Sequence, residues 1–288
     1  MTERPLRFGV SIIDPAVDWP VVAREAERLG YDVLSAVDHV GRSSPFPGLV
    51  AAAAATERIR LGTYVANASF WEPELLAREA ATVDRLSGGR LELGIGAGQS
   101  VVAATAGWSA QRRLDHLTET VERVGRLLSD PEHLPQGVQA PRPPLLIGGH
   151  EDAELALAAR EADTVAFIGA RLEPGGGLTL ADAGELAERV AFVRAHTAGR
   201  EPEFNIGVKL VVVTEDRRSG ALAARALAPQ LSVDRILDLP TVLIGTHREI
   251  AEQIRRHRAD HGFGYITVLG PYLEQFAPVI RLLREDGQ

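Results

Sequence analysis

The chain has 288 residues, 45% hydrophobic and 24% charged, and its 31 basic and 39 acidic side chains give a formal net charge of −8 at pH 7. This balance is typical of globular proteins and excludes the disordered and fibrous classes. The negative charge argues against a nucleic-acid partner, because such binding depends on clustered lysine and arginine.

Cysteine is absent, which removes disulfides, thiolate metal sites and cysteine nucleophiles. The longest apolar stretch, residues 49–55, is far shorter than the roughly 20 residues that a membrane-spanning helix needs. The first residues lead into a strand and contain no signal-peptide core. We therefore expect a cytoplasmic protein with no membrane partner.

Apolar, β-branched segments alternate along the chain with segments whose apolar residues recur at helical spacing. The predicted strands cover residues 6–13, 33–37, 59–65, 91–95, 145–147, 164–168, 206–213 and 265–269. The predicted helices cover about 18–29, 47–57, 73–86, 111–128, 151–161, 182–196, 217–227, 246–261 and 273–283, with a short extra turn at 232–237. Thr246 and Glu249 form a capping-box pattern at the start of one helix. This α/β alternation predicts a single (β/α)8 TIM barrel domain over residues 1–288.

In such a barrel the reacting groups lie at the C-terminal ends of the strands and in the loops that follow. The second predicted strand ends in Asp38 and His39. A histidine with an ordinary pKa near ~6.5 can exchange a proton with a bound ring or substrate. His39 is therefore the candidate catalytic residue, although a structural loop histidine is the alternative. No metal site is predicted, because no second histidine lies at ligand spacing from it.

Glycines follow two other predicted strands. The G-x-G-x-G run at residues 94–98, followed by Gln99, lets the backbone approach a phosphate or a flat ring, but it lacks the dinucleotide fingerprint. Gly148 and Gly149 precede a helix whose first amides could receive an anion. Glu151 and Asp152 weaken that interpretation, because they would repel a phosphate.

Several motifs together resemble the bacterial luciferase-like oxidoreductases, and within them the branch that depends on coenzyme F420. The likeness covers nearly the whole chain. It is carried by residues 30–32, 38–39, 60–63, 79–94, 144–149, 159–163, 242–246 and 276–278.

The resemblance implies an enzyme that passes a hydride between the central ring of the deazaflavin and a small organic substrate. It places Asp38 and His39 at the ring edge. It implies that the backbone of Val65, Ala66 and Asn67 forms a bulge under the ring, often with a non-prolyl cis peptide. It also implies that Ala97, Gly98, Gln99, Gly148 and Gly149 bind the cofactor, and that the protein is a homodimer.

The chain departs from the sugar-phosphate dehydrogenases of that family at three positions. Those enzymes have an acid where this chain has Gln99, an asparagine where it has Val102, and a tryptophan where it has Ser43. Gln99 cannot exchange a proton at neutral pH. We therefore expect reduction of a C=C or C=N bond rather than oxidation of a sugar phosphate. The alternatives are an FMN-dependent monooxygenase and a degenerate barrel that binds the cofactor without turnover.

Overall fold

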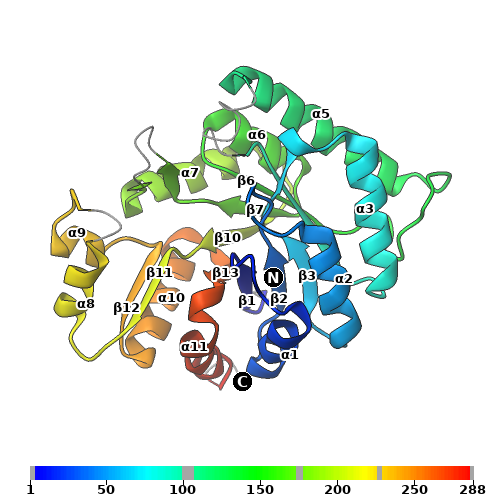
Figure 1. Ribbon diagram of the computed structural model, residues 1–288. Coiled ribbons are helices and arrows are strands. Elements are labelled where there is room, and N and C mark those ends of the chain that lie inside the picture. The colour runs from blue at the N-terminus through cyan, green and yellow to red at the C-terminus, as the bar shows by residue number, and fades with distance from the viewer. Residues whose placement is uncertain (1–3, 99–106, 173–177, 226–228, 286–288) are drawn as a thin grey trace.

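The computed structural model describes residues 4–98, 107–172, 178–225 and 229–285. Eight parallel strands form a closed barrel that helices surround (Figure 1). The third strand is in two pieces, β3 and β4, and the pairing of β3 with β5 closes the barrel. The predicted fold class is thereby confirmed. The barrel strands are β1 (Arg7–Ile12), β2 (Val33–Ala36), β3 (Arg60–Thr63), β4 (Ala66–Asn67), β5 (Leu91–Gly96), β6 (Leu145–Gly149), β7 (Thr164–Phe167), β10 (Glu203–Gly207) and β13 (Phe263–Leu269).

The outer helices begin and end close to where the sequence places them. Asp18 caps the first helix by accepting from the Val21 N–H, and Gly30 ends it at a φ of 91°. The capping box of Thr246 and Glu249 is present. The helices are α1 (Trp19–Leu29), α2 (Pro45–Ala55), α3 (Pro73–Leu86), α5 (Ala110–Ser129), α6 (Asp152–Glu161), α7 (Ala183–His196), α10 (His247–His261) and α11 (Leu273–Glu285).

The single strand predicted at 206–213 is wrong, because the segment forms two strands in different sheets. β10 belongs to the barrel, whereas β11 (Leu210–Val213) pairs outside it with β12 (Val242–Gly245). The chain leaves the barrel at Lys209, whose N–H donates to the Thr241 carbonyl rather than to a barrel strand. Strand β12 was not predicted from the sequence.

The two extra strands belong to a layer beside the barrel, on the left of Figure 1, together with α8 (Arg217–Ala224) and α9 (Val233–Leu237). A small separate cluster of buried apolar side chains, which includes Leu239 and Ile244, holds this layer together. A short antiparallel hairpin of β8 (Ala170–Leu172) and β9 (Leu178–Leu180) follows β7. Two 3-10 turns, η1 (Ala68–Phe70) and η2 (Gly270–Tyr272), complete the elements.

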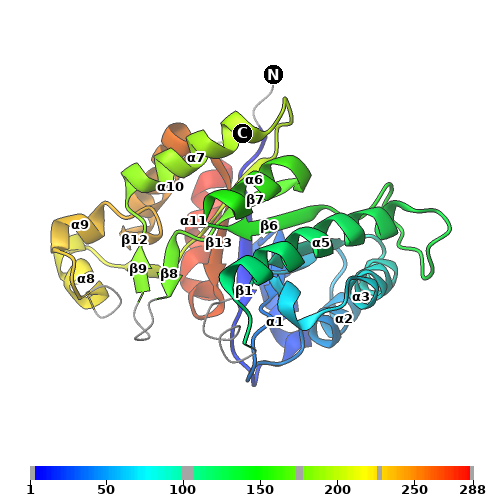
Figure 2. The same ribbon diagram turned by 90° about the horizontal axis from the view of Figure 1, so that it is seen from above.

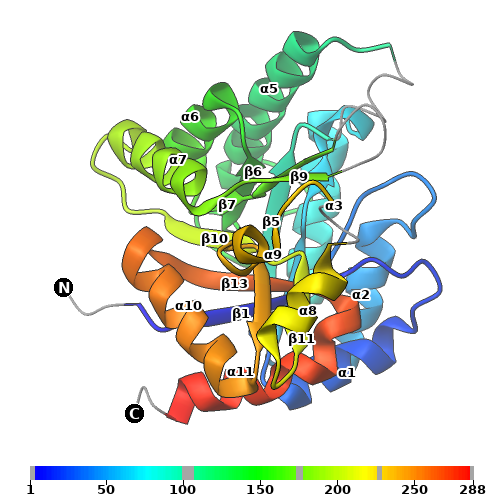
Figure 3. The ribbon, with the colours of Figure 1, turned by 90° about the vertical axis from the view of Figure 1, so that its left-hand side faces the viewer.

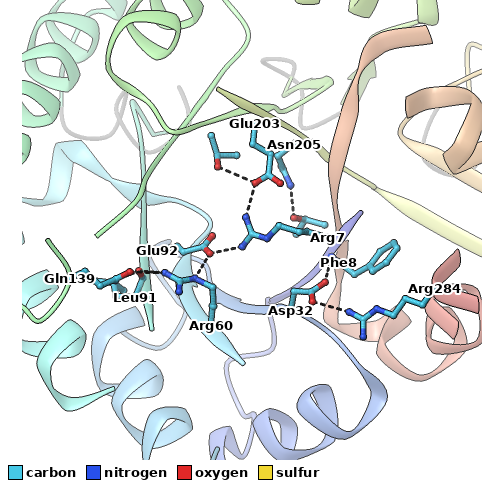
Figure 4. Close-up of polar contacts among 12 residues, drawn as sticks. Arg7, Phe8, Asp32, Arg60, Leu91, Glu92, Gln139, Glu203, Asn205 and Arg284 are labelled. Carbon is cyan, nitrogen blue, oxygen red and sulfur yellow. Dashed lines mark hydrogen bonds and ion pairs between the residues drawn. The ribbon is translucent and has the colours of Figure 1, made fainter. Parts of the chain in front are cut away.

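Inward-facing residues fill the barrel in layers. At the N-terminal end, Arg7 contacts Glu92 and lies 2.6 Å from Glu203, and Arg60 also contacts Glu92 (Figure 4). Burial alone would lower the pKa of Arg7, but Glu92 and Glu203 raise it above its usual value. The buried charges at this end therefore neutralise one another.

Above these charges lies an apolar layer of Val33, Leu146, Ala166 and Tyr265. The start of β1 and the end of α11 both lie at the N-terminal end of the barrel (Figures 2 and 3). Across the described ranges, no helix is both long and apolar enough to cross a membrane.

Candidate functional site at the C-terminal end of the barrel

Asp38, just beyond β2, is almost fully buried and joins three segments of the barrel rim. One of its carboxylate oxygens accepts from the Asn67 N–H at 3.0 Å and from the indole N–H of Trp71 at 2.8 Å. Both contacts use Oδ2, and no described residue bonds Oδ1. Asp38 therefore fixes the position of Asn67, and its contact with a cofactor, which the resemblance implies, stays a prediction.

His39 is half-buried, and no described residue hydrogen-bonds its imidazole. Burial lowers the pKa of His39 below its usual value, the Asp38 carboxylate partly offsets this, and Arg42 lowers it further. The ring is therefore mainly neutral at neutral pH, with one nitrogen able to donate and the other able to accept. These properties suit proton exchange with a ligand. The catalytic role of His39 stays a prediction.

A non-prolyl cis peptide joins Tyr64 and Val65, where β3 ends. The next two residues pair with β5, so that Asn67 lies opposite Gly96. The side chain of Val65 lies over two glycines: a Cβ on Gly96 would stand 2.6 Å from it, and one on Gly148 3.4 Å. Between its two pairings with β5 the third strand has one residue more than β5, so the bulge lies just before Ala66, at the start of the predicted segment 65–67. Glycines on β5 and β6 make room for Val65, and a supporting role for the segment stays a prediction.

Asn67 and Gly98 are packed against each other. Gly98 has a φ of 77°, and a Cβ there would stand 2.2 Å from Oδ1 of Asn67. That oxygen accepts from the N–H and the hydroxyl of Ser69. The Asn67 amide nitrogen, in contrast, is buried and has no partner among the described residues. A buried donor without an acceptor is uncommon, although five other buried side-chain atoms of the described residues share this state.

The remaining predicted residues are placed differently. Gly148 pairs with Gly96 and faces Val65, whereas Gly149 faces Glu154 of α6. The N–H groups of His150 and Glu151 donate to the Glu154 carboxylate at 2.9 and 3.3 Å, so the amides just before α6 already bind an anion. A main-chain contact from Gly148 or Gly149 to a cofactor phosphate stays a prediction. Ala97 is buried beside Gly98, while Gln99 and Val102 lie outside the described residues.

Sequence reasoning missed a polar group that lies across the barrel from the bulge. The Tyr64 hydroxyl donates to Asn205 Oδ1 at 2.7 Å, and the Asn205 amide donates to the Thr267 hydroxyl at 2.8 Å. Lys209 lies beside them, and burial lowers its pKa to about 8. The composition could have drawn attention to this position, because Lys209 is the only lysine of the chain.

A cavity of about 390 Å³ lies at the opposite, N-terminal end, where Arg7, Glu92 and Glu203 line it. Because these charges are paired with one another, and because barrel enzymes react at the other rim, we do not place the function there. In the parts of the chain that the structure describes, no three histidine or acidic side chains gather as a metal site would require.

The structure is therefore a closed parallel barrel that carries Asp38, His39 and the segment 65–67 at its C-terminal end. The family model described as "Luciferase-like monooxygenase" matches residues 20–233. The chain therefore belongs to the luciferase-like monooxygenase family.

Two relatives divide between two chemistries. The oxygenase component of the flavin-dependent trigonelline monooxygenase of Acinetobacter baylyi is 32% identical over 126 residues, which are 38% of this chain and 34% of that protein. The 5,10-methylenetetrahydromethanopterin reductase of Archaeoglobus fulgidus is 30% identical over 124 residues, which are 42% of this chain and 37% of that protein. The chain thus spans about a third of the length of the curated relatives it matches.

A solved structure is similar over nearly the whole length. The crystal structure of the monooxygenase RslO1 from Streptomyces bottropensis has a TM-score of 0.74 and 26% identity, and the match covers 97% of this chain and 98% of that one. The comparisons therefore agree on family and fold and leave the cofactor to be determined.

Proposed function

We propose that the protein is an oxidoreductase that binds coenzyme F420 at the C-terminal end of the barrel and reduces a C=C or C=N bond of a small organic substrate. The observation that carries the proposal is the bulge at residues 65–67, held by Asp38 and seated on Gly96 and Gly148. A flat ring needs such a rigid support beside groups that can hydrogen-bond its edge.

The residues present fit a ring of this kind. The amide nitrogen of Asn67 has no described partner and is enclosed, so it would donate to a carbonyl or nitrogen at the ring edge once the side chain turned toward the mouth. Gly98, which has no side chain, lets the chain pass close to Asn67. Asp38 keeps Asn67 in place, and the main chain of Ala97, Gly98, Gly148 and Gly149 would contact the rest of the cofactor.

When bound, the deazaflavin supplies a hydride at its central ring. Reduction of a C=C or C=N bond also requires a proton, and His39 would hold or pass it. The lowered pKa of His39 leaves the imidazole mainly neutral at neutral pH, so it can accept a proton from solvent and return it to the substrate. The relative that reduces methylenetetrahydromethanopterin supports this reductive chemistry.

A second candidate is an FMN-dependent monooxygenase. It is favoured by the full-length likeness to RslO1 and by the trigonelline monooxygenase relative. Flavin supports oxygen chemistry, whereas the deazaflavin largely does not, so the identity of the bound cofactor separates the two functions.

The test is a fluorescence titration of the purified chain with coenzyme F420 and with FMN, followed by turnover assays under argon and under air. F420 binding with anaerobic reduction of enones or imines is expected. FMN binding with oxygen consumption would replace the proposal by the second candidate. Binding without turnover of any substrate would favour a degenerate barrel.

We also propose that residues 1–288 act as one domain and that the protein is a homodimer in the cytoplasm. Sedimentation velocity of the purified chain at micromolar concentration tests the dimer, and a monomer over the whole concentration range would contradict it.

A further inference from the structure

Lys209 stands out in the composition of this chain. Of its 31 basic residues, 30 are arginine and only this one is lysine. Lysine differs from arginine because its compact ammonium changes pKa readily on burial and forms a point contact rather than a planar fork. A lone lysine inside a barrel therefore calls for a role that arginine does not fill.

The position of Lys209 is fixed at the barrel mouth. Its N–H donates to the Thr241 carbonyl at 2.7 Å, which holds the backbone where the chain leaves β10. The side chain turns back over Gly207: a Cβ on that glycine would stand 3.3 Å from the Lys209 ammonium and 2.8 Å from the Tyr64 hydroxyl. The ammonium thus lies near Tyr64, the residue that begins the bulge.

No described residue forms an ion pair or a hydrogen bond with this ammonium. The nearby polar groups are neutral: Asn205 and Thr267 cannot ionise, and burial raises the pKa values of Tyr64 and Tyr272. Burial also lowers the pKa of Lys209 to about 8. Lys209 is partly buried, and a charge that is partly removed from water without a counter-charge is costly.

We propose that Lys209 is the binding site for a carboxylate on the substrate. The ammonium would anchor that group on one side of the mouth, so that the unsaturated bond lies over the bulge at residues 65–67. The proposal rests on the proposed function and narrows its substrate class to small unsaturated monocarboxylic acids. A carboxylate fits better than a phosphate, because the described residues provide one cation here and no arginine beside it.

The single lysine allows a direct test that needs no turnover. Reductive methylation with ¹³C-formaldehyde labels only Lys209 and the N-terminal amine, and the Lys209→Met variant identifies the lysine resonance. Cinnamate and crotonate are titrated against their amides, cinnamamide and crotonamide, with and without bound cofactor. We expect the acids, and not the amides, to shift the Lys209 resonance saturably and to raise its pKa.

Calorimetry of the unmethylated protein supplies the affinities. Lys209→Met is expected to weaken binding of the better acid at least tenfold, and Lys209→Arg less, because it keeps the charge. Arg281→Met on the exposed face of α11 removes the same charge elsewhere and is expected to change nothing.

Three outcomes would overturn the assignment: a Lys209 resonance that no acid moves, one that acids and amides move equally, or one that F420 or FMN alone moves to the same extent. Tighter binding of phenyl phosphate than of cinnamate would replace the carboxylate by a phosphate. Because the titration is also done without cofactor, failure of the proposed function would appear separately, as absence of cofactor binding.

Discussion

The two ends of the barrel treat charged side chains in opposite ways. At the N-terminal end, Arg7 lies between Glu92 and Glu203, and each charge has an opposite charge beside it (Figure 4). At the C-terminal end, Lys209 has no described counter-charge and the Asn67 amide nitrogen has no acceptor. Charges that are paired within the fold need no ligand, whereas an unpaired charge at a barrel mouth can meet the charge of a ligand. The difference separates the end that holds the fold from the end that we assign to function.

The largest effect is expected at the C-terminal end, from His39→Ala. Loss of a proton-transfer group typically lowers kcat by about 10²- to 10⁴-fold. The melting temperature should change little, because no described residue hydrogen-bonds the ring. The measurement is turnover of an enone by the F420-loaded enzyme, with His196→Ala on the exposed side of α7 as the matched control. Full activity of His39→Ala would remove the catalytic assignment.

At the N-terminal end the largest effect is on folding. Glu92→Gln removes the carboxylate that contacts both Arg7 and Arg60, and breaking such a buried network costs about 3–5 kcal/mol of unfolding free energy. Glu25→Gln breaks the exposed pair with Arg28 and should cost less than about 1 kcal/mol. Urea unfolding of both variants checks this, and equal losses would contradict the division between the two ends.

Gly98→Ala tests whether Asn67 positions the cofactor at the C-terminal end of the barrel. Its Cβ would stand 2.2 Å from Asn67 Oδ1, so the asparagine must move. We expect cofactor binding to weaken by about tenfold, roughly 1.4 kcal/mol. Gly88→Ala has a similar positive φ of 67° but open space around it, and so controls for backbone strain alone. Equal cofactor affinity in the two variants would show that Asn67 does not position the ring.

The last effect has the opposite sign, because Lys209→Met is expected to gain stability. Burial lowers the pKa of this lysine from 10.5 to about 8, so the folded state disfavours the charged amine. The wild type is therefore destabilised below about pH 8, and this destabilisation fades as the pH rises toward 10.5. The variant should be more stable by about 1–3 kcal/mol at pH 7 and lose that advantage at alkaline pH. Thermal unfolding at pH 7 and pH 10 measures it, and a variant less stable than wild type at pH 7 would contradict the unpaired state of Lys209.

Much of the architecture was decided by local sequence. Residues such as Asp18, Gly30, Thr246 and Glu249 cap helices through contacts within a few positions, so the helix limits follow from spacing alone. The alternation of strands and helices likewise predicted the closed barrel, because a parallel sheet requires a crossover after each strand. The resemblance also led to Asp38, His39 and the bulge at residues 65–67, whose motifs lie at predicted strand ends.

Tertiary structure alone decided the rest. No local pattern separates β10 from β11, because the break at Lys209 depends on hydrogen bonds to Thr241, over 30 positions away. Nor does the sequence around Asn205 or Lys209 reveal that both lie beside Tyr64, since closure of the barrel brings the third and seventh strands together across its interior. Composition marked Lys209 as unusual, but only the fold places its charge at the mouth without a described partner.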